Sequence, residues 1–240
     1  MLKESKRRLV FFPAAFLLSA LLVSSLFSGE LSAQGKMTGA DEALLEGFLS
    51  RYQGISTLKA EYIRSTVTPS SDPVFKNQAS QTAVGTLYWK KPYNLRLDQI
   101  SPDKEEMVVF GSTAWWHIPK EKRVHVYRNL DLASEYYSLM SFFDGISELR
   151  KKFDVTMVPA SETRGTLKGF TLSPKEGEEG GRITVFCDGD RKLQGFRLGS
   201  ATGERTDFYF NYINPGASLA ENLFVFKPPK GTEVVEEASE

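Results

Sequence analysis

The sequence predicts a mainly β protein with inserted helices, in which a strongly curved antiparallel sheet of about eleven strands forms an unclosed barrel. Short runs of alternating apolar and polar residues recur along the 240-residue chain, separated by hairpin-length breaks rich in proline, glycine or aspartate. Aromatic residues, 12% of the chain, concentrate in these runs. Only two or three segments have helical spacing. So many short strands in one domain are expected to curl, because closing or covering a sheet protects its edges.

The first 33 residues have the pattern of a secretory signal peptide. Four basic residues precede an apolar run over residues 9–27, namely Lys3, Lys6, Arg7 and Arg8. The best candidate cleavage site ends at Ala33, although the apolar run is also long enough to cross a bilayer as an uncleaved anchor. Either alternative predicts export. Residues 34–235 are then predicted to form a single domain, followed by a solvated acidic tail over 236–240.

Composition excludes several classes of protein. The 30 Lys and Arg residues are balanced by 30 Asp and Glu residues, so the chain has no basic footprint for a nucleic acid. The sole cysteine, Cys187, follows a strand-like run and is expected to be a small buried hydrophobe. His117 and His125 flank one turn, where they are expected to be solvated, and they lack the spacing of a zinc site. Neither a metal nor a cofactor is expected.

The motifs of common enzymes are also missing. No G-x-S-x-G nucleophile elbow occurs, and Cys187 has no histidine near it in the sequence. The glycine-rich stretch at 177–181, GEEGG, is acidic and typical of a surface turn rather than of a phosphate-binding loop. The sequence therefore predicts a protein that is not an enzyme.

Three segments have helical patterns. Residues 41–52 repeat apolar residues at helical spacing, with Thr38 or Asp41 as the candidate cap and Gly54 as the stop. Residues 133–143 form a second pattern, and residues 146–152 form a short third one. The second pattern places four apolar residues on one face: Tyr136, Leu139, Met140 and Phe143.

Strands are predicted on both sides of the second helix. The sequence Asp188-Gly189-Asp190 is a strong hairpin turn between two of them. The predicted strands cover residues 58–63, 83–90, 93–100, 106–110, 113–118, 123–127, 154–158, 166–172, 183–187, 193–198 and 206–213, with a last short strand over 223–226.

Trp115 and Trp116 are adjacent in one predicted strand and must therefore point to opposite faces of the sheet. One interpretation is that helices cover one face and half-exposed aromatic residues occupy the other. The alternative is a curved sheet whose concave side is incompletely filled and is covered by the helix over 133–143. That arrangement would enclose an apolar cavity suited to hydrocarbon. Composition does not separate the two interpretations.

Several segments together resemble one known family. They are GTLYWKKPYNLRLD at 85–98, EMVVFGSTAWWHIPKEKRV at 106–124, LSP at 172–174 and FVFKPPKGTEVV at 224–235. In order and spacing they resemble the LolA family of periplasmic outer-membrane lipoprotein carriers. The resemblance extends over nearly all of the chain after the signal region.

The resemblance implies an unclosed sheet with helices across its mouth and a cavity for the acyl chains of lipoproteins. It implies acylated lipoproteins as cargo, an ATP-driven lipoprotein-releasing transporter in the inner membrane and a lipoprotein receptor in the outer membrane as partners, a periplasmic location and a monomer. The expected cavity lining is Trp89, Leu95, Leu97, Val109, Trp115 and Phe208. The helix face formed by Tyr136, Leu139, Met140 and Phe143 is the expected cover.

One position departs from the family pattern. The family often has an arginine immediately before the proline of this stretch, where it bonds to the covering helices and holds the empty cavity closed. Here that residue is Lys91, which offers a point charge instead of a fork of donors. Either Lys91 or Arg96 is the candidate latch.

Three other functions compete with that of a carrier. The nearest is a periplasmic regulator of the same fold that senses lipids or lipoproteins, which usually has a second domain. A secreted lipid hydrolase would need a nucleophile and base that the sequence lacks. An adaptor domain with a filled core would bind no lipid.

Overall fold

The computed structural model describes residues 37–67, 79–128, 142–175, 182–199 and 204–237. Two α-helices, α1 (Gly39–Tyr52) and α3 (Ile146–Lys152), are accompanied by the short 3-10 helices η4 (Pro119–Glu121), η5 (Phe142–Asp144), η6 (Ala160–Glu162) and η7 (Glu221–Phe224). The strands are β1 (Thr57–Val67), β2 (Ala79–Lys90), β3 (Asn94–Ser101), β4 (Glu105–Phe110), β5 (Thr113–Ile118), β6 (Arg123–Tyr127), β7 (Phe153–Met157), β8 (Lys168–Pro174), β9 (Arg182–Cys187), β10 (Leu193–Gly199), β11 (Arg205–Pro215) and β12 (Glu233–Glu237).

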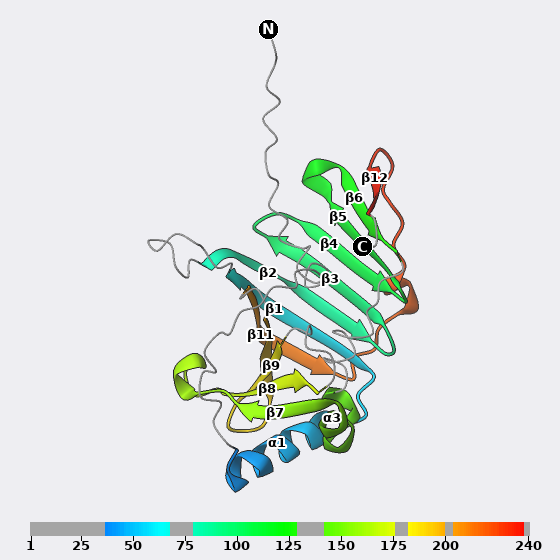
Figure 1. The fold of residues 1–240 in the computed structure, drawn as a ribbon. Coiled ribbons are helices and arrows are strands. Elements are labelled where there is room, and N and C mark those ends of the chain that lie inside the picture. The colour runs from blue at the N-terminus through cyan, green and yellow to red at the C-terminus, as the bar shows by residue number, and fades with distance from the viewer. Residues whose placement is uncertain (1–36, 68–78, 129–141, 176–181, 200–203, 238–240) are drawn as a thin grey trace.

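All twelve strands belong to one sheet, in the order β12-β6-β5-β4-β3-β2-β1-β11-β10-β9-β8-β7 (Figure 1). Two meanders, β1 to β6 and β7 to β11, are joined by antiparallel pairing of the long strands β1 and β11. Every pair is antiparallel except β6 and β12, which are parallel. The predicted curved and mainly antiparallel sheet is therefore confirmed, with a parallel strand added at one edge.

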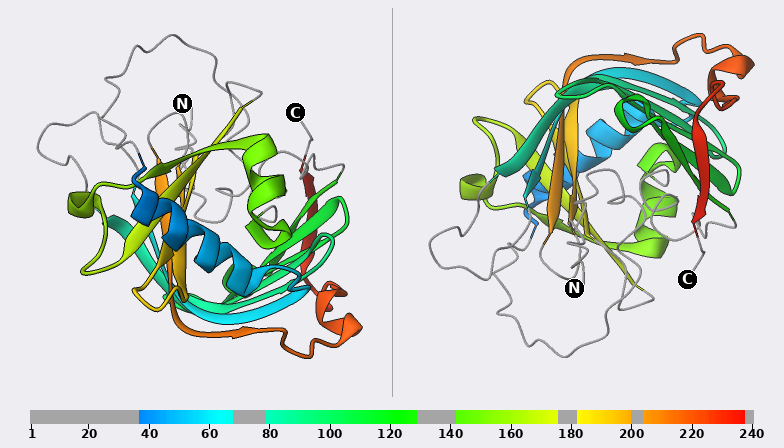
Figure 2. Two further views of the ribbon diagram at one scale, coloured as in Figure 1. Left: turned by 90° about the horizontal axis from the view of Figure 1, so that it is seen from below. Right: turned by 90° about the horizontal axis from the view of Figure 1, so that it is seen from above.

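The sheet curves around the helices without closing. Figure 2 shows α1 and α3 inside the curve, whereas the C-terminal segment around η7, drawn in orange, runs outside it. The end strands β7 and β12 do not pair with each other in the described sheet. We call the surface that faces α1 and α3 the concave face and the opposite surface the convex face.

Strand alternation in β1 separates these two faces. Leu58, Ala60 and Tyr62 are buried, while Glu61 between them is exposed. The buried set belongs to the same apolar core as Leu45 and Phe48 of α1, so the helices and the concave face share one core.

Helix α1 begins with a capping box. The Thr38 side chain accepts a hydrogen bond from the Asp41 backbone N–H at 3.2 Å, and the Thr38 N–H donates to the Asp41 carboxylate at 2.9 Å. The Thr38 hydroxyl also donates to the Asp41 carboxylate at 2.7 Å, and this bond, together with the one from the Thr38 N–H, holds the pKa of the Asp41 carboxyl below its ordinary value. Thr38 is thus the cap, and Asp41 is its partner three residues later. Gly54, with a φ of +80°, follows the end of the helix as predicted.

The prediction of a strand over 223–226 is wrong. Residues Glu221–Phe224 form η7 instead, with Phe224 fully buried. The Arg96 guanidinium donates to the Leu223 carbonyl at 3.0 Å. In a strand, this carbonyl would instead accept a hydrogen bond from the neighbouring strand. Apolar residues at alternate positions therefore reflect packing against the convex face of the sheet rather than pairing within it.

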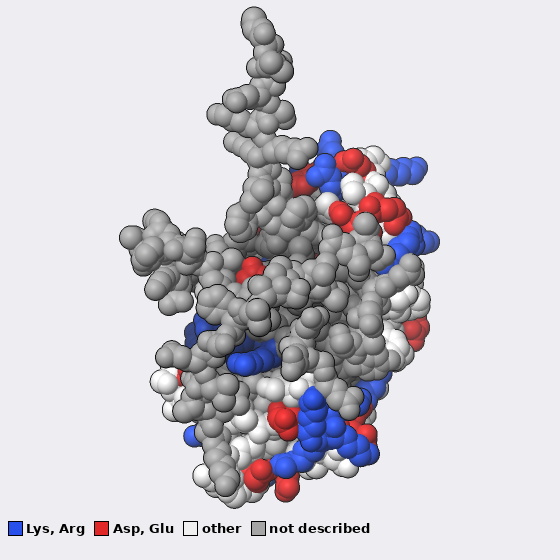
Figure 3. Space-filling view, viewed as in Figure 1, with Lys and Arg blue, Asp and Glu red and all other residues white. Residues whose placement is uncertain are grey.

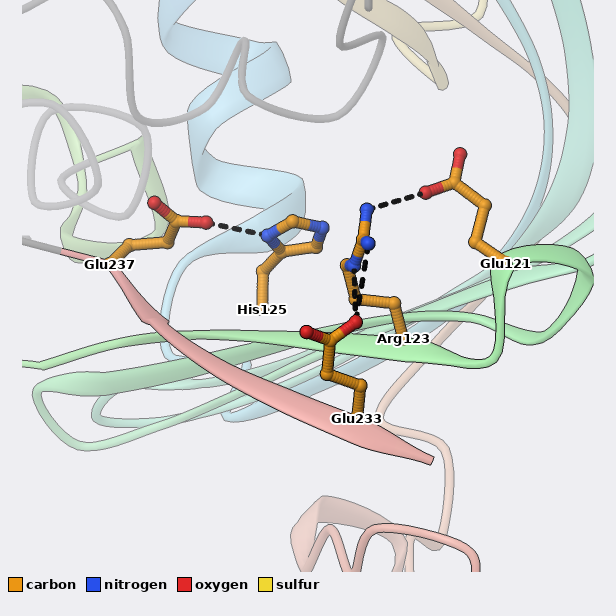
Figure 4. Close-up of polar contacts among 5 residues, drawn as sticks. All are labelled: Glu121, Arg123, His125, Glu233 and Glu237. Atoms are coloured by element: carbon orange, nitrogen blue, oxygen red, sulfur yellow. Dashed lines mark hydrogen bonds and ion pairs between the residues drawn. The ribbon is translucent and has the colours of Figure 1, made fainter. Parts of the chain in front are cut away.

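The first two residues of the predicted acidic tail belong to a strand. Glu236 and Glu237 belong to β12, which pairs along the edge of β6. Arg123 binds Glu233, and His125 Nδ1 lies 2.6 Å from a Glu237 carboxylate oxygen (Figure 4). Acidic side chains that face basic ones on the neighbouring strand favour the pairing of this segment with β6, although Glu233 and Glu236 remain exposed.

Some predictions lie outside the described residues. They concern the signal peptide or anchor over 1–33 and most of the helix over 133–143, whose last residues belong to η5. The short helix at 146–152 is confirmed as α3. Within the described residues, no helix is long and apolar enough to cross a membrane.

Candidate functional site: the apolar concave face

A continuous set of buried apolar side chains lines the concave face. Strand register places Leu58 beside Trp89, Trp89 beside Leu95, and Leu95 beside Val109. On the other side of β1, β11 and β10 continue the set with Phe210, Phe208 and Phe196. The two arms of the curved sheet therefore present one apolar surface to the same interior.

Five of the six predicted lining residues lie on this surface and are buried: Trp89, Leu95, Leu97, Val109 and Phe208. They come from β2, β3, β4 and β11, and strand alternation points them all to the concave side. Phe208 contacts the rings of Phe196 and Tyr62, with centroids 4.7 and 5.3 Å apart.

The placement of Trp115 in the lining is wrong. Trp115 pairs across the sheet with Val108 and Val126 on the convex face, and its ring stacks on Phe226 at 6.3 Å. Trp116 lies on the concave face instead, beside Met107, and is 2% exposed. One face of β5 therefore packs into the apolar core, and the other packs against the C-terminal segment. This explains why two adjacent indoles are both accommodated.

The predicted cover is described at only one of its residues. Phe143 of η5 is buried, and its ring stacks on Trp89 with centroids 4.6 Å apart and planes 19° apart. The carbonyl of Phe143 accepts a hydrogen bond from the Gly54 N–H at 3.1 Å, which ties η5 to the end of α1. Tyr136, Leu139 and Met140 lie outside the described residues.

Of the two latch candidates, Lys91 contacts η5, which contains the described end of the predicted cover. Its Nζ donates to Asp144 Oδ1 at 2.8 Å, one residue beyond Phe143. Both side chains are more than one-third exposed, so the pair contributes at most about 1 kcal/mol. Arg96 points to the convex face, where it binds Asp98, Glu106 and the Leu223 carbonyl, and it cannot latch the cover from there.

The concave face also carries polar groups that sequence reasoning missed. Arg64 of β1 is 9% exposed, and its Nη2 donates to the Gln99 side chain of β3 at 2.7 Å. The Tyr62 hydroxyl and the Trp89 indole N–H are buried without a hydrogen-bond partner among the described residues. Alternation from Leu58 through Tyr62 would have placed Arg64 on the inner face, but an arginine in a strand is usually read as exposed.

Burial raises the pKa values of two tyrosines on the concave face. Burial raises the pKa of Tyr62 from 10.0 to about 12. Burial, and secondarily the Glu237 charge, raises the pKa of Tyr127 to about 12. Both phenols therefore stay protonated at neutral pH.

The expected solvated histidines are buried. His125 is 3% exposed on the concave face, where its ring contacts Trp116 and its Nδ1 meets Glu237. His117 is 9% exposed on the convex face and lies against Phe226. The C-terminal segment covers one ring and binds the other, which short-range sequence patterns could not reveal.

Cys187 is buried, as predicted, and burial raises the pKa of its thiol to about 12. No group of three or more metal-ligating side chains occurs among the described residues. In the view of Figure 3, the described Lys and Arg residues are intermixed with Asp and Glu.

A half-barrel sheet wrapped around helices, with a buried apolar inner face, defines the structural class. The chain belongs to the family described as outer membrane lipoprotein carrier protein LolA, whose family model matches residues 54–227. The resemblance carried by the segments at 85–98 and 106–124 is thereby confirmed.

Individual relatives are similar at modest identity. A protein named outer-membrane lipoprotein carrier protein from Methylococcus capsulatus is 27% identical over 221 residues, which cover 90% of this chain and 97% of the relative. One of the same name from Dechloromonas aromatica is 28% identical over 184 residues, covering 75% and 82%. A solved LolA superfamily protein from Nitrosomonas europaea aligns with a TM-score of 0.38 at 10% identity, covering 77% of this chain and 97% of that one.

Proposed function

We propose that this protein is a periplasmic carrier that binds the acyl chains of lipoproteins against its concave face and moves them from the inner to the outer membrane. The proposal rests on one observation above all, the continuous buried apolar surface from Leu95 through Trp89 to Phe208, against which η5 packs through Phe143. Membership of the LolA family and the names of the curated relatives support it.

The size of the hydrocarbon explains why a covered apolar face suits this task. Each buried CH₂ contributes roughly 0.8 kcal/mol, so two or three long acyl chains favour a membrane by tens of kcal/mol. A carrier has to shield much of that surface from water and still release it. A cover that packs on the empty face and moves aside for cargo weakens net binding by the contacts it gives up.

The residues take distinct parts in this proposal. Trp89, Leu95 and Leu97 would contact acyl chains, together with Val109, Phe208 and Trp116. Phe143, with Tyr136, Leu139 and Met140, would form the cover. The ion pair between Lys91 and Asp144 would hold the cover closed in the empty protein.

The proposed partners follow from the proposed cargo. They are acylated lipoproteins, an ATP-driven transporter in the inner membrane that releases them, and a receptor in the outer membrane that accepts them. The carrier would act as a monomer in the periplasm, without catalysis and without binding nucleic acid.

Binding of a synthetic tripalmitoylated cysteinyl peptide tests the proposal. Phe143→Glu places a carboxylate against Trp89 and should abolish binding, because burying an unpaired charge beside acyl chains is costly. The control is Phe110→Glu, since Phe110 is 51% exposed at the end of β4. Circular dichroism should show that both variants are folded. Unchanged binding by a folded Phe143→Glu protein would remove the cover from the proposal.

A further inference from the structure

Hydrogen-bond donors lie on the concave face without acceptors. The Tyr62 hydroxyl belongs to a side chain that is 1% exposed, and it has no hydrogen-bond partner among the described residues. Leaving a buried polar group unpaired destabilises a fold, so each such group in a native structure calls for an explanation. Phe in this position would keep the packing against Phe208 and remove the unpaired group.

Arg64 is the second donor at this place. Its guanidinium has several N–H groups, of which one bonds to Gln99 at 2.7 Å, and no described carboxylate forms an ion pair with it. Gln99 in turn donates to the Asp103 carbonyl at 2.9 Å, which fixes the amide and leaves its oxygen for Arg64. A buried guanidinium is therefore held in position with donors to spare.

The neighbouring strand is shaped to accommodate these two side chains. Tyr62 pairs across the sheet with Gly85, and Arg64 pairs with Ala83. A Cβ added at Gly85 would lie only 2.6 Å from the Tyr62 Oη, so the missing side chain lets the phenol lie across β2. Tyr62 and Arg64 are two residues apart on one face, about 7 Å along the strand.

We propose that Tyr62 and Arg64 form a polar subsite that binds the ester carbonyl oxygens at the heads of the acyl chains. An ester-linked diacylglyceryl group carries acceptors and no donors in that region, which complements a pair of unused donors in an otherwise apolar face. This inference rests on the proposed function and assigns the part of the ligand that the apolar residues cannot recognise. Such contacts would fix the depth to which the chains enter.

Two further observations agree with this assignment. Burial raises the pKa of Tyr62 to about 12, so the hydroxyl keeps its proton and remains a donor at neutral pH. Arginine is the cation most readily accepted in such a site, because its guanidinium is weakly hydrated and always charged. The Trp89 N–H lies beneath Phe143, farther along the face, and takes no part in the subsite.

Ester and ether ligands with the same hydrocarbon separate polar recognition from burial. Displacement of a fluorescent apolar dye is measured for dipalmitoylglycerol and for dihexadecylglycerol, which lacks the carbonyl oxygens. The wild-type protein should bind the ester about tenfold more tightly, the size expected of one or two hydrogen bonds to carbonyls. Tyr62→Phe and Arg64→Met should each reduce that preference, and the double variant should remove it.

Tyr52→Phe is the matched control. Its hydroxyl accepts a hydrogen bond from the Leu193 N–H at 2.8 Å, so this change should lower stability and leave the ester preference intact. Equal affinity of the wild-type protein for ester and ether would overturn the subsite while leaving the carrier function standing. If neither ligand displaced the dye, both proposals would fail. If a phosphate on the dialkylglycerol restored full affinity, the acceptor would be phosphate and the assignment to ester carbonyls would be wrong.

Discussion

The ring of Phe143 stacks on the indole of Trp89 with 4.6 Å between centroids, and this contact joins η5 to the concave face. One residue farther along the chain, Asp144 meets Lys91, two residues after Trp89. An apolar contact and an ion pair therefore hold the same short segment, η5, against the end of β2. In the proposed function, a ligand would compete for the apolar contact, and the ion pair would set how easily the segment departs.

Changing Lys91 should alter the closure of the cover more than the stability of the fold. Lys91→Ala should lower the free energy of unfolding by less than about 1 kcal/mol, because the pair with Asp144 is exposed. It should also increase binding of a fluorescent apolar dye to the empty protein. Lys91→Arg offers a fork of donors to the carboxylate and should decrease dye binding and slow release of bound lipopeptide.

The control is Lys120→Ala, which removes an exposed ion pair between η4 and Asp103, away from η5. It should leave dye binding unchanged. If Lys91→Ala and Lys120→Ala behaved alike, the contact with Asp144 would not regulate the cover.

The two tryptophans should have separable roles. Trp116→Ala removes an indole from the concave face beside Met107 and should weaken binding of the tripalmitoylated peptide. Trp115→Ala removes the contact with Phe226 on the convex face and should lower stability, while the folded protein binds the peptide normally. Chemical denaturation and peptide titration of both variants measure the two effects. Loss of binding with Trp115→Ala alone would reverse the assignment of the faces.

Stability should fall at high pH through the buried phenols. Because the pKa of Tyr62 is raised from 10.0 to about 12, the unfolded chain loses this proton first as the pH rises. The contribution is complete below pH 10 and is lost between pH 10 and about 12. Urea unfolding across that interval should show a shallower decline for Tyr62→Phe than for the wild-type protein. Parallel declines would mean that the phenol is solvated.

The ion pair on the convex side of β10 and β11 should stabilise the fold strongly. Arg197 and Asp207 are 13% and 9% exposed at the side chain, and their closest atoms are 2.6 Å apart. Asp207→Ala would leave a buried guanidinium unpaired, which costs about 3–5 kcal/mol in stability. Glu236→Ala breaks an exposed pair with Arg128 and should lower stability much less, because solvent screens an exposed ion pair. Thermal unfolding of the two variants compares these costs, and similar losses would contradict the burial of the first pair.

Local patterns were sufficient for most of the fold. Alternation and turn residues located the strands from β1 to β11 because each half-buried strand carries its signal within a few residues. The C-terminal region was not predictable in this way. Whether the apolar residues around Phe224 pair in a strand or pack on the convex face depends on contacts with Arg96 and Trp115, which are distant in sequence.

Strand patterns also predict which face of the sheet many of the candidate site residues share. Residues whose direction follows from strand register, such as Leu95 and Val109, lie on the concave face, where the alternation in the sequence places them. The choice between Trp115 and Trp116 depends on which face is concave, and curvature is a property of the whole sheet. The buried Arg64 was missed because composition assigns arginine to the surface, whereas its place inside depends on Ala83 opposite it on β2 and on the hydrogen bond to Gln99 of β3.

Photo-crosslinking in living cells tests the central claim most directly. Benzoylphenylalanine replaces Trp116 on the concave face in one protein and Tyr212, which is 52% exposed on the convex face, in another. Irradiation should join acylated lipoproteins to the first position and leave the second without lipoprotein adducts. Lipoprotein adducts at Tyr212 and none at Trp116, or none at either position, would contradict a carrier that holds acyl chains inside its curved sheet.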